Sequence, residues 1–207
     1  SDVQVGLGIA TGGDDPVSSN QTLGGGASSK SLALDLAYFN WAATKEINVY
    51  GGKYNNIYYR VAGSQLLCDG DLNPEGLGVT YNNRGFFAAV GANFLESDTK
   101  NNSDAMALGS QLGYKVSFGD SSVVAGVSYF QLETAGLGTF YGDADDFFGN
   151  SFECANPADL SSCVYAYDYN EVELFAQLST TVADLPLVVY GDWVQNQDAD
   201  DNDTGWT

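Results

Sequence analysis

Oxygen-bearing side chains alternate in one Gly- and Pro-containing segment, at Asp69, Asp71, Asn73 and Glu75. Proteins bind Ca²⁺ through six to eight oxygens, and loops of this spacing can wrap around the ion. The EF-hand pattern also needs a Gly at its sixth position and a Glu further on, and neither is in place here. A second acidic run spans residues 198–203. Two interpretations stay open: calcium bound in the acidic loops, or acidic turns without metal.

Catalytic chemistry finds little support in the residue types. The chain has no His, so the most common general base is missing. Glu171 and Glu173 share one face of an expected strand, at a spacing that glycosidase acid pairs can have. Acids on a strand face are also common on pore walls, and no nucleophile–base pair accompanies them. We therefore expect a protein that is not an enzyme and requires no cofactor.

The three cysteines favour a disulfide over a metal site. Cys154 and Cys163 flank one polar loop, which suits a local disulfide in an oxidising compartment. Cys68 would then remain unpaired. Without His or a close Cys pair, a zinc site is disfavoured.

The charge balance limits the partners. The 207 residues include 27 acidic and 7 basic side chains, for a formal net charge of −20. Such a polyanion repels nucleic-acid phosphates. The acidic residues either concentrate cations at a pore or keep an aggregation-prone protein in solution.

No apolar run reaches the ~20 residues of a spanning helix, whereas barrel strands need only ~9–11 alternating residues. The chain passes from residues 1–4 directly into a strand pattern without a signal peptide. We expect a mature, trimmed or partial chain.

Segments of about ten residues alternate between apolar and small or polar side chains, a period that places them on opposite faces of a strand. In the first segment Val3, Val5 and Leu7 share one face. In the second, Leu34, Leu36 and Tyr38 are expected to do so. The expected strands are residues 2–11, 31–42, 47–54, 76–82, 85–96, 105–118, 122–133, 168–182 and 187–197, with a further strand starting at Thr204.

The face opposite the apolar rows is dominated by small and polar residues. A β-sandwich buries bulky side chains on its inner face, whereas a membrane barrel turns them towards lipid and small or polar ones towards water. The fold class predicted is all-β, an antiparallel transmembrane β-barrel, with about 9–10 strands in this segment of a larger barrel.

Short and long connections alternate, as in outer-membrane barrels. Residues 43–46, 119–122 and 183–186 form short turns. The long polar stretches are residues 12–30, 55–75, 97–104, 134–167 and 197 onward. The stretch 55–75 mixes tyrosines, Arg60 and carboxylates, and we expect it to fold inward as a constriction. Aromatic residues near strand ends match interfacial girdles: Tyr38, Trp41, Tyr50, Tyr54, Tyr129, Phe130, Tyr167, Tyr169 and Trp193.

Charged side chains are costly against lipid, so the strand face that carries them is expected to be the inner wall of such a barrel. This criterion predicts seven pore-lining residues: Asp35, Gln111, Lys115, Glu171, Glu173, Gln177 and Asp192. Their mixed charges either form a transverse field that orients solutes or form salt bridges across the wall.

Two longer motifs carry a family resemblance. The segments Leu7–Gly24 (LGIATGGDDPVSSNQTLG) and Gly63–Leu77 (GSQLLCDGDLNPEGL) resemble signatures of the "putative porin" family of Gram-negative bacteria. The likeness runs over almost the whole chain. Family members are longer, with a signal peptide, earlier strands and a closing strand that ends in an aromatic residue. The resemblance therefore implies further strands before and after residues 1–207, which we expect to form one incomplete barrel domain.

The resemblance implies an outer-membrane pore for passive diffusion of small hydrophilic solutes or ions, and the acidic charge suggests a cation preference. The expected partners are outer-membrane lipid, the solutes and further copies in a homotrimer, with no nucleic acid. The alternative is a secreted or cell-surface, Ca²⁺-stabilised β-sheet protein with a structural or adhesive role. The two differ in whether the apolar rows face lipid or a second sheet.

Overall fold

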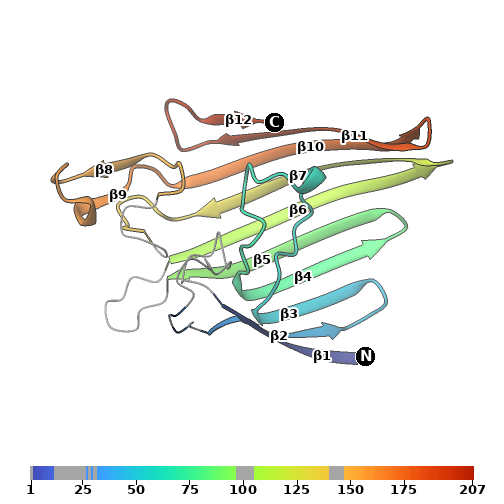
Figure 1. The fold of residues 1–207 in the computed structure, drawn as a ribbon, viewed down its shortest axis with the longest axis horizontal. Coiled ribbons are helices and arrows are strands. Elements are labelled where there is room, and N and C mark those ends of the chain that lie inside the picture. The colour runs from blue at the N-terminus through green and yellow to red at the C-terminus, as the bar shows by residue number, and fades with distance from the viewer. Residues whose placement is uncertain (1, 12–26, 28, 30–31, 97–104, 140–146) are drawn as a thin grey trace.

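One ten-stranded antiparallel sheet dominates the computed structural model, which describes residues 2–11, 27, 29, 32–96, 105–139 and 147–207 (Figure 1). Each strand pairs with its neighbours in chain order, because the strands follow one another through hairpins. The strands are β1 (Asp2–Ala10), β2 (Ala33–Ala42), β3 (Ile47–Lys53), β4 (Glu75–Asn83), β5 (Phe86–Glu96), β6 (Ala105–Phe118), β7 (Ser121–Leu132), β10 (Tyr169–Val182), β11 (Leu185–Asn196) and β12 (Thr204–Trp206). The antiparallel all-β fold predicted from the alternation is confirmed.

The connections of this sheet sort by length to its two ends, short turns at one end and long loops at the other (Figure 1). The turns at Arg84–Gly85 and Ala183–Asp184 have positive φ at both central residues, the conformation that matches the twist of a two-residue hairpin. This arrangement agrees with the alternating connection lengths of the sequence.

The sheet is open in the described part of the chain. β1 pairs with β2 alone and β12 with β11 alone, so these strands are its two edges. No helix among the described residues is long and apolar enough to span a membrane.

The two faces of the sheet differ in exposure. The outer face, named here for the side that carries Val5, Leu112 and Leu174, leaves these side chains 82%, 51% and 51% exposed. The opposite inner face carries Gln111, buried at 2% exposure. In the described residues the apolar rows of the outer face therefore do not pack against a second sheet, which a soluble sandwich requires.

The expected parity of β2 is wrong beyond its first residues. Leu34 is exposed on the outer face, but Tyr38 lies on the inner face and Phe39 and Trp41 take the outer one. The cause is a register irregularity opposite β1, where the pairing shifts between Gly8 and Ile9. One extra residue in a strand reverses the alternation that follows it.

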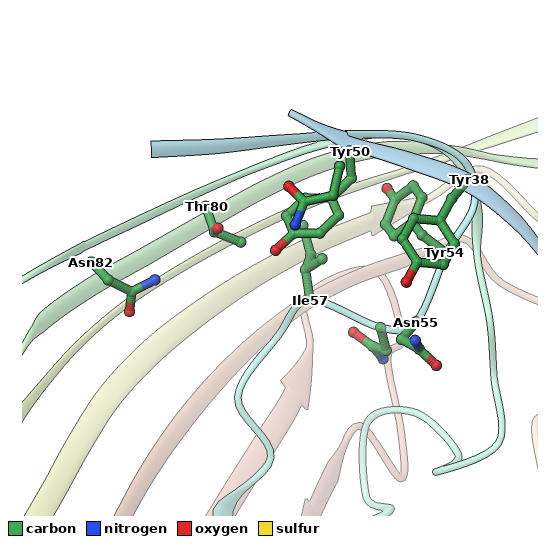
Figure 2. A pocket seen from close by; sticks show the side chains of 9 residues that line it. Tyr38, Tyr50, Tyr54, Asn55, Ile57, Thr80 and Asn82 are labelled. Atoms are coloured by element: carbon green, nitrogen blue, oxygen red, sulfur yellow. The ribbon is translucent and has the colours of Figure 1, made fainter. Parts of the chain in front are cut away.

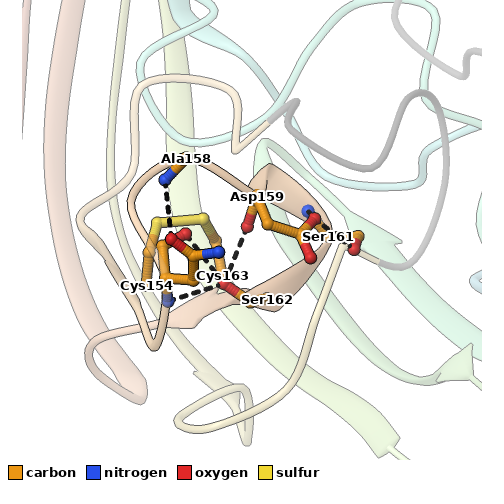
Figure 3. Close-up of a disulfide and its surroundings, with 7 residues drawn as sticks. Cys154, Ala158, Asp159, Ser161, Ser162 and Cys163 are labelled. Atoms are coloured by element: carbon orange, nitrogen blue, oxygen red, sulfur yellow. Dashed lines mark hydrogen bonds between the residues drawn. A yellow bond between two sulfur atoms is a disulfide. The ribbon is translucent and has the colours of Figure 1, made fainter.

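A small hairpin lies in the stretch 134–167, where the sequence predicts only a loop. Its strands β8 (Phe152–Cys154) and β9 (Cys163–Tyr165) are three residues each, and Cys154 pairs with Cys163 in register. These two cysteines form a disulfide. Figure 3 shows the polar turn that it closes, in which the Asp159 carboxylate accepts hydrogen bonds from the backbone N–H and hydroxyl of Ser161.

Candidate functional site

Residues 54–74, here called the inner loop, lie across the inner face of the sheet. Figure 1 shows this segment, between β3 and β4, crossing in front of the middle strands. Its short helix η1 (Val61–Gly63) contacts β10 and β11. Tyr54 at the start of the loop donates a hydrogen bond to Asn93 of β5, and Ser64 donates one to Asp192 of β11. The inner loop thus spans the sheet from β5 to β11, in the inward position expected of a constriction.

The Gln111 amide holds the middle of the inner loop. Its Oε1 accepts from the Tyr59 backbone N–H at 2.7 Å, and its Nε2 donates to the Tyr59 carbonyl at 2.9 Å. The same Nε2 donates to the Ser128 hydroxyl at 3.0 Å. A primary amide carries a donor and an acceptor side by side, so it can pair with both groups of one backbone residue as a strand would.

Gln177 of β10 holds the next residues of the loop. Its Oε1 accepts from the Ala62 backbone N–H at 2.7 Å and from the Tyr59 hydroxyl at 3.1 Å. Gln111 and Gln177 therefore fix one short segment from two different strands.

Carboxylates gather where the inner loop meets β10 and β11. Glu173 and Asp192 are only 4% and 3% exposed, and Glu171 is half-buried on the same face of β10. The Ser128 hydroxyl donates to Glu173, and the Ser64 hydroxyl donates to Asp192 at 2.5 Å. These contacts place the predicted residues Glu173 and Asp192 beneath the loop.

An apolar cluster that the sequence analysis missed lies under η1. Val61 is fully buried against Val124 and Phe175, with Tyr59 and Phe87 packed around them. The Tyr59 ring lies 5.7 Å from Phe175 and 5.6 Å from Phe87, centroid to centroid. Phe87 and Phe175 occupy inner-face positions of their strands, where the sequence otherwise has small or polar residues. These two large side chains were the sequence signal for an apolar contact on the inner face.

Some of the small residues on the inner face are small because the loop rests on them. A Cβ added at Gly91 or Gly109 would lie 2.6 Å or 2.3 Å from the Tyr58 hydroxyl oxygen. Real Cβ atoms do not approach so closely, so both positions exclude larger residues while Tyr58 stays in place. The small residues on the inner face are therefore explained in part by contact with the inner loop, and not by a water-filled lumen alone.

Comparison with protein families decides the identity of the chain. Residues 1–136, about two thirds of its length, match the family described as "Putative porin". The chain belongs to the putative porin family. No curated protein matches it.

The family match covers β1 to β7 and the whole inner loop. Strands β10 and β11 continue the same sheet in this family member, and they supply Gln177 and Asp192 as hydrogen-bond acceptors to the loop. Of the two signature segments, Gly63–Leu77 lies in the inner loop and the start of β4, whereas most of Leu7–Gly24 lies outside the described residues.

Two predicted pore-lining residues of this putative porin, Asp35 and Lys115, lie away from the others. Asp35 accepts a hydrogen bond from Asn73 at 3.0 Å, near the end of the inner loop. Lys115 is exposed near the short-turn end of β6. In the described part of the chain, neither side chain makes a hydrogen bond to residues 59–62, the loop segment that Gln111 and Gln177 hold.

The acidic alternation of this family member forms a turn. Asp69 accepts from the backbone N–H of Asp71 at 2.8 Å, the Asn73 side chain donates to Asp35, and Glu75 begins β4. Among the described residues, no three Asp, Glu or Cys side chains converge as a metal site would require. Calcium binding stays a prediction.

Cys68, in the inner loop, is a free thiol that accepts a hydrogen bond from Asn56 at 3.1 Å. Burial raises its pKa to about 11, and burial also raises the pKa of Tyr54 to about 12. Because the thiolate is the reactive form, Cys68 is a poor nucleophile at neutral pH.

Proposed function

We propose that the protein forms an outer-membrane channel for passive diffusion of small hydrophilic solutes or ions, with the inner loop as its constriction and without catalysis. One observation carries the proposal: the outer face exposes rows of bulky apolar residues, while the inner face buries polar residues under a pinned loop. This is the arrangement in which one face meets acyl chains and the other surrounds water.

The proposal requires a closed sheet in the membrane. Unpaired backbone groups at β1 and β12 would be costly in hydrocarbon, where water cannot satisfy them. We therefore propose that further strands pair with both edges, from the same protein or from other copies. A homotrimer of closed barrels is the assembly that we propose.

The distribution of charge supports a cation preference. Glu171, Glu173 and Asp192 lie where the loop meets the wall, and the protein carries a net charge of −20. The loop between β11 and β12, at the long-loop end, adds four aspartates within residues 198–203. Negative charge at a pore mouth raises the local cation concentration and disfavours anions.

Planar bilayers test this function with the full-length protein. We expect stepwise, ohmic conductance and a reversal potential in a KCl gradient that reports selectivity for K⁺ over Cl⁻. Replacing Asp198, Asp200 and Asp201 by Asn should reduce that selectivity. The matched control is Asp120→Asn, which removes a carboxylate at the short-turn end. Absence of discrete channels would refute the function, and equal effects of both variants would refute the role of the acidic mouth.

A further inference from the structure

We infer that the inner face carries a binding subsite for a neutral sugar, between the first residues of the inner loop and strands β2, β3 and β4. A cavity of about 420 Å³ lies there, lined by Tyr38, Asn40, Tyr50, Tyr54, Asn55 and Asn82 among others. Its volume falls within the roughly 300–1,000 Å³ of ligand pockets. The inference rests on the proposed function, because it names a solute class for that channel.

Aromatic rings form one end of this cavity. Figure 2 shows Tyr38, Tyr50 and Tyr54 gathered together, with Thr80 and Asn82 at the other end and Asn55 on the loop facing them. The Tyr50 and Tyr54 rings lie 5.8 Å apart and tilted by 33°. Tyr54 is fixed in this position, because its hydroxyl donates to Asn93 at 2.6 Å.

Glycines on the wall seat two of these rings. A Cβ at Gly6 of β1 would lie 2.3 Å from the Tyr38 ring, and one at Gly78 of β4 would lie 2.9 Å from the Tyr54 hydroxyl oxygen. The rings therefore lie against bare backbone, and a larger residue at either glycine would push them away. The positions of Tyr38, Tyr50 and Tyr54 near strand ends predict an interfacial girdle, but these residues line the inner face.

The polar groups of the cavity are amides and hydroxyls. None of its lining side chains is charged, in a protein with a net charge of −20. The Oδ1 of Asn40 is buried and has no hydrogen-bond partner in the described part of the chain. A buried acceptor without a partner costs free energy, so a ligand hydroxyl that donates to it would bind favourably.

This combination matches the chemistry of a sugar. A pyranose ring has an apolar C–H face and a rim of hydroxyls. The face of a Tyr ring carries partial negative charge and attracts such polarised C–H groups. Asparagine amides supply both donors and acceptors, as hydroxyl groups require. An organic cation would also lie over Tyr faces, but it has no use for donor amides.

Binding of maltose to the detergent-purified full-length protein tests the subsite, by isothermal titration calorimetry and by block of the single-channel current. We expect maltose to bind, and Tyr38→Ala and Asn40→Ala each to weaken it about tenfold. Tyr38→Phe, which keeps the ring, should retain most of the affinity. Tyr190→Ala is the matched control, because this exposed tyrosine of β11 lies outside the cavity.

The two readouts separate this inference from the proposed channel. Maltose binding in detergent without channels in bilayers would support the subsite and refute the channel. Channels without maltose binding would refute the subsite alone. Binding of tetramethylammonium in place of maltose, or equal weakening by Tyr190→Ala and Tyr38→Ala, would also overturn it.

Discussion

At the scale of single residues, two glutamine amides define where the inner loop rests. Gln111 makes hydrogen bonds to both backbone groups of Tyr59 and to Ser128, and Gln177 accepts from Tyr59 and Ala62. These positions are predictable as inner-facing from strand parity, because amides are disfavoured against lipid. Their partners in the loop are not predictable, because side chain–backbone pairing over this sequence distance leaves no periodic signal.

Replacing Gln111 by Ala should loosen the constriction. The substitution removes three hydrogen bonds and leaves the Tyr59 N–H without its acceptor, at a cost of about 1–3 kcal/mol. We expect a larger and noisier single-channel conductance and a lower unfolding temperature. Gln131→Ala is the control, because the loop does not contact that side chain in the described structure. An unchanged conductance would show that the loop does not limit the pore.

The Cys68 thiol should react with maleimide only at high pH. Burial raises its pKa from the ordinary 9 to about 11, so between these values the unfolded chain ionises while the folded chain keeps its proton. Its contribution to stability is therefore full below pH 9 and is lost as the pH rises through 11. The labelling rate, followed from pH 7 to 11, should rise about two pH units later in the folded protein than in the denatured protein. Coincident profiles would contradict burial of the thiol.

At the scale of elements, alternation in the sequence predicts strands well and their local irregularities poorly. The ten main strands follow from period-two patterns, and their observed ends lie close to the expected ones. The reversal at Tyr38 could not be foreseen, because a register shift depends on the partner strand. The hairpin β8–β9 was missed because three residues are too few to show a period. Phe87 and Phe175 were missed as loop contacts because parity does not say what covers a face.

A positive charge on the outer face should destabilise the protein far more than one on the inner face. Leu112→Arg places a guanidinium among exposed apolar residues of β6, at a cost of about 2–4 kcal/mol near the middle of a bilayer. Ser117→Arg is the comparison, because residue 117 of the same strand lies on the opposite parity. Folding into lipid vesicles, followed by heat-dependent gel mobility, measures the difference. Equal tolerance of both variants would argue against a lipid-facing surface.

The disulfide should stabilise its own hairpin without affecting the pore. Cys154 and Cys163 close a loop with a sequence separation of 9, for which chain entropy gives about 2–3 kcal/mol. The double Ser variant should therefore be cleaved faster by protease within residues 147–168, with unchanged conductance. Cys68→Ser is the control for loss of a cysteine outside the hairpin. A changed conductance would mean that this hairpin touches the path of the solute.

At the scale of the whole molecule, the sheet is asymmetric in two ways. The sheet has an apolar exposed face and a face closed over by the inner loop, and it has an end of short turns and an end of long acidic loops. The difference between the two faces can be predicted from the alternation of apolar and small or polar residues along each strand. The difference between the two ends follows from connection lengths. Closure of the sheet is not readable from either, because it depends on the strands that pair with β1 and β12.

The most direct test of this account is lipid accessibility along β6. Cysteines introduced singly at the exposed residues 112 and 114–117, in a Cys68→Ser background, would carry a spin label in reconstituted vesicles. A lipid-facing outer row predicts a period of two, with collisions with membrane-dissolved oxygen highest at residues 112, 114 and 116, and collisions with a water-soluble nickel chelate highest at 115 and 117. A uniform profile, or a profile with the opposite phase, would contradict it.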